Sequence, residues 1–323
     1  MPAPAMSTLE TEPDTLVEAT NRSLQAAANR HWVDSAMAHQ AALSLMTAFT
    51  RTATLVEMLG WSSDCIKSAL APSRKAFAES VFMKRCQQWP RGYPGDFETI
   101  EYLAGAVNRS DPESIGWYFE QILLQSPATR QHRNKLNRQT VEIVNGIKRR
   151  PDARIFSLAC GGCLDWIPVL PDLAGFSGEI VLNDCEPAAL ELAESRFSAV
   201  TRRYRLVPGN ILRVARHLAD LSGFDLTIAG GLFDYLSDRA VVSLLRTIHG
   251  RLLAPNGVLL FTNMAEGNPW RTLMQYGSDW PIIERSEARI RGLCAEAGIG
   301  ASEVEMTRDE TGLALLVRVV RGA

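Results

Sequence analysis

The sequence predicts an α/β fold in which a mostly parallel sheet follows a helical N-terminal domain. An apolar run at 155–159 ends at a glycine pair, and a second run at 179–184 ends in an acid. From residue 154 to the end, further apolar runs alternate with stretches of helical periodicity. Such alternation is typical of βαβ units, whose strands are parallel.

The chain has 323 residues, more than most single domains, and we expect three parts. Residues 1–15 are rich in Pro, Thr and Glu and predict a disordered tail. Residues 16–126 predict a helical domain that serves as lid or substrate domain, because apolar side chains recur there every three or four residues. Residues 127–323 predict a cofactor-binding α/β domain.

Helices are expected at 96–107, at 112–124 with Asp111 as N-cap, and at 127–148. Before the first of these helices, residues 89–97 combine two prolines, two glycines and three aromatic side chains. A loop of this composition indicates a lid or a pocket wall. A rigid turn packed on the helical domain is the alternative.

In the α/β part, five strands and four helices should alternate, followed by a final pair of strands. The expected strands are 154–160, 179–184, 204–208, 224–229 and 257–263, and the expected helices are 187–199, 210–221, 239–253 and 285–297. The final pair, 302–308 and 313–320, is separated only by residues 309–312, a turn short enough for a hairpin. The last strand should therefore run antiparallel to the others.

The first two strands indicate which ligand the sheet binds. Glycines after a first strand let a ligand approach the backbone, and an acid that ends the second strand can hold ribose hydroxyls. Dinucleotide sites require a third glycine, whereas the loop here reads Cys160-Gly161-Gly162-Cys163 and no P-loop lysine follows. A ligand with ribose but no phosphate fits better, and S-adenosylmethionine (SAM) is the common one. An ordinary strand–turn is the alternative.

Ligands of open parallel sheets lie beyond the carboxyl ends of the strands. The residues just after each strand are therefore the candidates for cofactor binding: Ala159, Cys160, Gly161, Gly162, Asp184, Cys185, Gly209, Asn210, Ile211, Gly230, Gly231 and Phe233. Arg133, on the basic face of helix 127–148, could in addition meet the methionine carboxylate of SAM. Asn210 and Ile211 would meet the adenine. Phe233, Asp234 and Tyr235 would lie nearest the reacting centre.

The glycine pair together with Asp184 resembles motif I of the class I SAM-dependent methyltransferases, which have a Rossmann-like sheet with an antiparallel last strand. Four longer segments are similar to a bacterial subgroup with a helical N-terminal domain, associated with synthesis of 3-hydroxypalmitic acid methyl ester. These segments are 91–98, 133–134, 231–239 and 274–285. The sequence differs from that subgroup at Gln275, Glu284 and the second half of the glycine loop, so we expect an altered acceptor pocket.

The resemblance implies SAM as cofactor and an enzyme of secondary metabolism. Methyl transfer to a small molecule, expected to be a carboxylate, is the first hypothesis; Arg285 or Arg133 would pair the acceptor. Tyr93, Phe97, Tyr235 and Trp280 would form the pocket walls. Azetidine-2-carboxylate synthases are similar to this subgroup, so cyclisation of SAM, which releases methylthioadenosine, is the second hypothesis. A SAM-binding regulator without catalysis is the third.

Composition excludes several partners. The 34 basic and 36 acidic residues give a net charge of −2, without the basic surface that nucleic-acid binding requires. The sequence has neither a long apolar run nor a signal peptide, so we expect a cytoplasmic protein with a small-molecule substrate and no membrane partner. The oligomeric state stays open. Its six cysteines are expected to be free thiols, and those at 160 and 163 to line the cofactor loop without metal or redox use.

Overall fold

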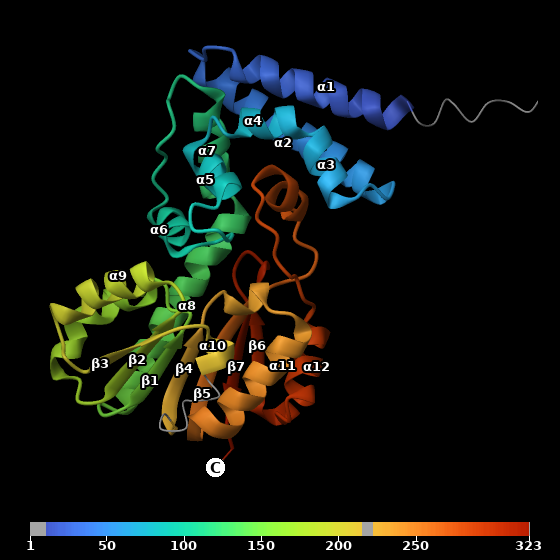
Figure 1. Ribbon diagram of the computed structural model, residues 1–323. Coiled ribbons are helices and arrows are strands. Elements are labelled where there is room, and N and C mark those ends of the chain that lie inside the picture. Colours follow the sequence, from blue (N-terminus) through green and yellow to red (C-terminus); the bar gives the residue numbers. More distant parts are fainter. Residues whose placement is uncertain (1–10, 215–221, 323) are drawn as a thin grey trace, which may run out of the picture. The chain divides into compact units, whose positions relative to one another are not determined.

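The computed structural model describes residues 11–214 and 222–322, which form two compact units (Figure 1). The first unit comprises the chain up to Thr129 together with Pro269–Pro281, and the second comprises Arg130–Asn268 and the chain from Ile282 on. The segment 269–281 thus departs from the predicted domain 127–323, because its side chains pack into the helical unit. Residues 1–10 of the predicted tail lie outside the described residues, but residues 11–15 are helical.

The first unit is built from helices around one apolar core. Its helices are α1 (Thr11–Ala28), α2 (Ser35–Met58), α3 (Ser63–Ala69), α4 (Ala71–Phe77), α5 (Val81–Gln88), α6 (Phe97–Gly105) and α7 (Ile115–Gln125). At the centre, the ring of Phe77 lies edge-on to Phe49 and to Phe119, with centroids 4.9 Å apart in both pairs. Leu273 and Tyr276, from the segment 269–281, complete this core.

Short polar side chains set where these helices begin. Ser80 and Asp96 accept hydrogen bonds from backbone N–H groups in the first turns of α5 and α6, as N-cap residues do. The helix predicted to start at Pro112 starts at Ile115 instead, because Ser114 is the cap. The side chain of Asp111, the predicted cap, accepts from the N–H of Glu113 within the preceding turn, and the carbonyl of Asp111 accepts from the N–H and the hydroxyl of Ser114.

The segment 269–281 is tied to the helical unit by polar contacts as well as by apolar packing. Glu57 of α2 pairs with Arg271 and accepts a hydrogen bond from the hydroxyl of Tyr276 at 2.7 Å. Asp279 pairs with Lys67 at 2.5 Å, and its carbonyl accepts from the indole of Trp89 at 2.8 Å. Because these partners come from several helices, the segment belongs structurally to the first unit.

The aromatic loop 89–97 is also held by charged contacts. The guanidinium of Arg91 lies 4.5 Å from the ring centroid of Phe97 and donates to Glu98 at 2.9 Å. Arg85 donates to Asp96 at 2.7 Å. These bonds fit the alternative of a rigid turn on the helical unit; the role as a lid or pocket wall stays a prediction.

Glu120 of α7 is the polar centre of the first unit. Its side chain is fully buried, and it has no cation among its hydrogen-bond partners. One oxygen accepts from the N–H of Phe82 at 2.9 Å, and the other from the N–H of Arg109 at 2.7 Å. The hydroxyls of Ser80, Ser110 and Tyr102 also donate to the carboxylate. Burial raises the pKa of this carboxyl, but the donated bonds outweigh burial and hold the pKa below its usual value.

The second unit contains a seven-stranded sheet in the order β3-β2-β1-β4-β5-β7-β6. The strands are β1 (Arg154–Leu158), β2 (Glu179–Asp184), β3 (Tyr204–Pro208), β4 (Phe224–Ala229), β5 (Leu253–Met264), β6 (Val304–Arg308) and β7 (Ala314–Val320). Strand β7 pairs antiparallel with both β5 and β6, while β1 to β5 pair in parallel. The prediction of a mostly parallel sheet with an antiparallel last strand is confirmed.

Helices cover both faces of this sheet (Figure 1). Apolar residues of α8 (Pro127–Arg149), η1 (Leu164–Gly175) and α9 (Pro187–Ser198) share one core with Ile155 and Ile180. Those of α11 (Asp238–Thr247) and α12 (Glu287–Glu296) share the other with Phe156. Helix α10 covers Ile211–Val214; the rest of its predicted span, 215–221, lies outside the described residues. A π-helical turn, η3 (Ile248–Leu252), follows α11.

Glu120→Gln should destabilise the protein. Each carboxylate oxygen of Glu120 accepts a backbone N–H, so the amide nitrogen of Gln meets a donor in either orientation. We expect the free energy of unfolding to fall by about 1–3 kcal/mol, the usual cost of a buried polar group left unpaired. Urea unfolding measures this, with the exposed Glu113→Gln as control. Equal stability of the two variants would contradict the assignment.

Candidate functional site

The turn that follows β1 has an unusual backbone. Ala159, Gly161 and Cys163 all have positive φ, at 47°, 53° and 60°, and only one of them is glycine. The left-handed conformation is costly for other residue types, and such strain concentrates at functional sites. The N–H of Cys160 donates to the carbonyl of Asn183 at 2.9 Å, which fixes the turn to the end of β2.

Asp184, at the end of β2, holds the same turn through its side chain. One carboxylate oxygen accepts from the N–H of Gly161 at 2.8 Å, and the other accepts from the N–H of Glu186 at 2.9 Å. The residue is only 8% exposed, and burial raises the pKa of its carboxyl although the backbone bonds oppose the shift. Each oxygen of a carboxylate can accept more than one bond, so Asp184 keeps acceptor capacity for ribose hydroxyls. The residues present fit a ribose-bearing cofactor.

The exit of β3 is positioned by Asn183, which sequence reasoning missed. Its amide donates to the carbonyls of Val207 and Gly209 at 2.7 and 2.9 Å. A polar residue inside the apolar run of β2 was the available signal. Gly209 has a φ of 123°, which a residue with a side chain rarely adopts.

Of the two residues predicted to meet adenine, Asn210 is exposed and Ile211 is buried. The side-chain oxygen of Asn210 accepts from the N–H of Leu212 at 2.9 Å, and among the residues that the structure describes none accepts its amide hydrogens. Ile211 is 5% exposed and packs in the core, so little of its side chain is free to cover adenine. Cys185 is exposed as a residue, but partial burial of its thiol, together with the charge of Asp184, raises the pKa of that thiol.

Two glycines at the exit of β4 have different structural roles. A Cβ on Gly230 would lie 2.3–2.5 Å from the amide of Gln139 on α8, so the glycine permits that close approach. Gly231 has a φ of 83°, and no atom would lie within 4 Å of a Cβ added there. Its N–H donates to the hydroxyl of Thr262 at 3.1 Å.

A buried ion pair lies just beyond these glycines. Lys135 of α8 donates to Asp234 at 3.1 Å, and their side chains are 3% and 6% exposed. Asp234 also accepts from the N–H of Met264 at 2.6 Å. Asp234, which was predicted to act near the reacting centre, thus joins α8 to the ends of β4 and β5. Lys135 was not predicted, because from sequence it appears as one more polar residue of the helix.

Two predicted site residues prove to be structural. The ring of Phe233 is fully buried and stacks on Phe261 with centroids 4.4 Å apart, so its side chain is not available to a cofactor. Arg285 is 3% exposed, and its guanidinium donates to Asp238 at 2.8 Å and to Asn263 at 2.6 Å. It also donates to the carbonyls of Phe233 and Leu236. Four of its five N–H groups are engaged in this way, so Arg285 holds the segment after β4 and has little donor capacity left for an acceptor carboxylate.

The remaining candidates are distributed over both units. Tyr235 is 40% exposed, in contrast to its buried neighbours Phe233 and Asp234. Tyr93 and Trp280 are half-buried members of the helical unit. Arg133 is half-buried on α8, where burial and the charge of Arg130 lower its pKa. Contacts of these side chains with a cofactor or an acceptor stay predictions.

Asp165 is a second buried acid near the β1 turn. It is 4% exposed, and burial raises its pKa to about 7, although the backbone N–H groups of Asp165 and Trp166 act in the opposite direction. Its carbonyl accepts from the hydroxyl of Thr140 on α8 at 2.7 Å. Pro168 and Pro171 follow within η1, where they prevent a regular α-helix.

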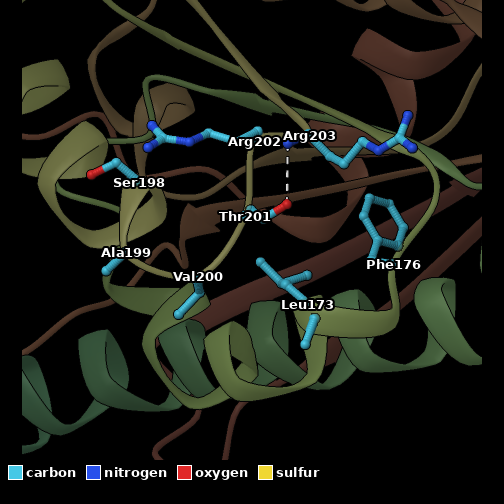
Figure 2. Close-up of a pocket in the computed structure, with 9 residues that line it drawn as sticks. Leu173, Phe176, Ser198, Ala199, Val200, Thr201, Arg202 and Arg203 are labelled. Atoms are coloured by element: carbon cyan, nitrogen blue, oxygen red, sulfur yellow. Dashed lines mark hydrogen bonds between the residues drawn. The ribbon is translucent and has the colours of Figure 1, made fainter.

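A hollow of about 460 Å³ lies elsewhere in the second unit (Figure 2). Leu173 and Phe176 line it from the segment before β2, and residues 198–203 line it from the segment before β3. It is therefore at the amino ends of the strands. Arg202 and Arg203 point in opposite directions there (Figure 2), so they do not converge on one ligand group.

Within the described ranges, no group of three His, Cys, Asp or Glu side chains could hold a metal ion. Among the same residues, no helix combines the length and the apolar character needed to traverse a lipid bilayer.

Comparison with known proteins shows similarity of fold. No family model matches the sequence, and no curated protein sequence matches it significantly. A Bordetella parapertussis structure called a possible exported protein aligns over 99% of this chain and 100% of its own, with a TM-score of 0.61 and 17% identity. A second protein therefore has a similar fold over nearly the whole length of this chain.

Two methyltransferase structures align less closely. An O-methyltransferase of Nostoc punctiforme, itself described as putative, covers 99% of this chain and 100% of its own, with a TM-score of 0.48 and 14% identity. The magnesium protoporphyrin IX methyltransferase of Synechocystis with bound SAH covers 60% of this chain and 87% of its own, with a TM-score of 0.45 and 15% identity. At TM-scores below 0.5 these similarities carry no functional argument.

Lys135→Met should destabilise the second unit, because it leaves the carboxylate of Asp234 buried without its cation. Removal of one partner of a buried pair typically costs roughly 3–5 kcal/mol. The double variant Lys135→Met/Asp234→Asn should recover most of this loss. Urea unfolding of both, with the exposed Lys148→Met as control, measures the difference. A double variant no more stable than the single one would argue against the pair.

Asp165 should make stability depend on pH. Its pKa in the folded protein, about 7, exceeds the ordinary value of 3.8, so its stabilising contribution is complete below pH 4 and is lost as the pH rises towards 7. Asp165→Asn should remove this loss, on the order of 2–4 kcal/mol. Unfolding free energies from pH 4 to 8 test this, with the exposed Asp172→Asn as control. Parallel pH profiles of wild type and Asp165→Asn would refute the assignment.

Proposed function

We propose that this protein is a SAM-dependent enzyme that acts on a small molecule. The observation that supports this most directly is the strained turn at 159–163, held by the carboxylate of Asp184 at the carboxyl end of neighbouring strands. Ligands of open parallel sheets bind at this edge. The acid at the end of β2 provides acceptors for ribose hydroxyls, while the turn lacks the features of a phosphate site.

Residues at the carboxyl ends of the parallel strands would each contact a different part of SAM. Asp184 binds the ribose, and the amide of Asn210 meets the adenine edge. Gly231 leaves the backbone after β4 accessible to the methionine portion, Gly230 lets Gln139 of α8 approach that backbone, and Lys135 keeps Asp234 in place. Bound SAM supplies the electrophilic carbon next to its sulfonium. Catalysis then depends on bringing a nucleophile to that carbon in a dry aromatic pocket, for which no proton-transfer residue is essential.

Methyl transfer to a small-molecule acceptor is the first candidate reaction. A carboxylate acceptor requires a cation, and Arg133 is the candidate that remains after Arg285 is assigned to the segment following β4. Tyr235 is 40% exposed, and its ring is the proposed wall of the acceptor pocket in the second unit.

The internal use of Arg285 also favours a second candidate reaction. One of two proposed anchors for an external acid is absent, whereas cyclisation of SAM needs no external acceptor. In that reaction the α-amine of SAM attacks its own γ-carbon, methylthioadenosine leaves, and azetidine-2-carboxylate forms. A pocket that excludes water would assist by keeping the amine unprotonated.

Incubation with SAM alone distinguishes the two reactions. Methylthioadenosine together with azetidine-2-carboxylate, identified by mass spectrometry, would reject methyl transfer. S-adenosylhomocysteine that forms only when small carboxylic acids are added would reject cyclisation.

Asp184→Ala should weaken SAM binding about ten- to a hundredfold, because hydrogen bonds to a charged acceptor contribute roughly 1.5–3 kcal/mol. Calorimetry measures the affinity, with the exposed Glu191→Gln as matched control and a thermal melt to verify folding. If the folded wild-type protein does not bind SAM, the proposed function is wrong.

A further inference from the structure

Two cysteines enclose the turn that follows β1. The N–H of Cys163 donates to the carbonyl of Cys160 at 2.9 Å, and Gly161 and Gly162 occupy the middle of this hydrogen-bonded turn. Gly161 has a φ of 53° while Gly162 is not in the positive region, as in type II′ turns. The ends of a β-turn lie within about 7 Å, and disulfides join Cα atoms about 4.4–6.8 Å apart. The backbone therefore already holds the two cysteines at bridging distance.

The two side chains have different surroundings. The thiol of Cys160 donates to the carbonyl of Gly161, the next residue, at 3.5 Å. Cys163 is 1% exposed, whereas Cys160 is half-buried and can be reached from solvent. Burial raises the pKa of the Cys163 thiol, with the neighbouring Cys160 acting in the same direction, so this thiol is a slow nucleophile. The sequence predicts small side chains that line a loop. The structure adds that a hydrogen-bonded turn brings the two thiol-bearing residues together.

We propose that Cys160 and Cys163 form a reversible disulfide that lowers the affinity of the protein for its cofactor. Formation of the disulfide is independent of the proposed function, while its effect on affinity rests on that function. No metal is required.

The reaction is a thiol–disulfide exchange with a small-molecule disulfide such as oxidised glutathione. The thiolate of Cys160 attacks one sulfur of the oxidant, and the first glutathione thiolate leaves. The thiolate of Cys163 then attacks the sulfur of Cys160, the new bond closes, and the second glutathione thiolate leaves. Two protein thiols are oxidised, one disulfide is reduced, and the two protons pass to the leaving groups.

The link to the cofactor site is the residue between the two cysteines. Gly161 donates its N–H to Asp184 at 2.8 Å, and the carbonyl of Gly162 accepts from Arg196. A disulfide has a specific S–S distance and dihedral angle, so it constrains the backbone of the turn that it closes. Glycine has the widest range of backbone conformations, so we expect the turn to adjust at Gly161 and to weaken its bond to Asp184.

The first experiment tests the disulfide itself. Native protein is equilibrated with oxidised and reduced glutathione at several ratios, alkylated and digested, and analysed by mass spectrometry. We expect a peptide pair linked through Cys160 and Cys163, two fewer free thiols, and a transient glutathione adduct on Cys160 because the second step is slow. If both thiols remain reduced while exposed Cys65 and Cys185 are modified, the proposal is overturned.

The second experiment tests the effect on the cofactor. Calorimetry with SAM should give at least a tenfold weaker affinity for the oxidised than for the reduced protein, and dithiothreitol should restore it. Cys160→Ala cannot form the mixed disulfide, and Cys163 is buried, so this variant should show the same affinity under both conditions, whatever its absolute value, while Cys65→Ala should respond like wild type. A disulfide that forms without changing the affinity would overturn the switch. Absence of SAM binding by reduced wild type would instead reject the proposed function and leave the disulfide result standing.

Discussion

The carboxylate of Asp184 is the interaction on which the proposed site depends. It ends β2, and it accepts from backbone groups on both sides, at Gly161 after β1 and at Glu186 before α9. A buried carboxylate is costly unless such donors compensate it, and the raised pKa of this acid shows that they do so only in part. The remaining acceptor capacity at a strand end is the chemical basis for proposing a ribose-binding site.

The sheet could be predicted because its signals are local. Apolar runs that stop at Gly161-Gly162 or at Asp184 mark strands and their ends, and the short turn at 309–312 predicts the hairpin that makes β7 antiparallel. The residues immediately after each strand follow from topology alone. For the same reason Gly161, Asp184, Gly209 and Gly231 were correctly placed at strand exits in the structure.

Partners distant in the sequence could not be predicted in this way. Arg285 binds groups contributed by residues 233–238 and by Asn263, and no spacing in the sequence shows that its donors are engaged. Phe233 follows a strand, as a ligand contact would, yet it stacks on Phe261. Lys135 and Asn183 could not be recognised from the sequence. Each is a buried polar residue that binds a distant partner, and the spacing of apolar residues does not show which polar side chains are buried. For Cys160 and Cys163 the sequence predicts only small side chains lining a loop, because the spacing does not show that a hydrogen-bonded turn brings the two residues together.

The segment 269–281 has a consequence for how the chain can be divided. Because it leaves the second unit after Asn268, supplies Leu273 and Tyr276 to the helical core and returns at Ile282, the polypeptide passes between the units three times. A fragment that stops at Thr129 would retain seven helices and lose two of their central apolar side chains. The helical unit is therefore not one continuous module of the sequence, because its core is complete only when the chain returns to it after β5.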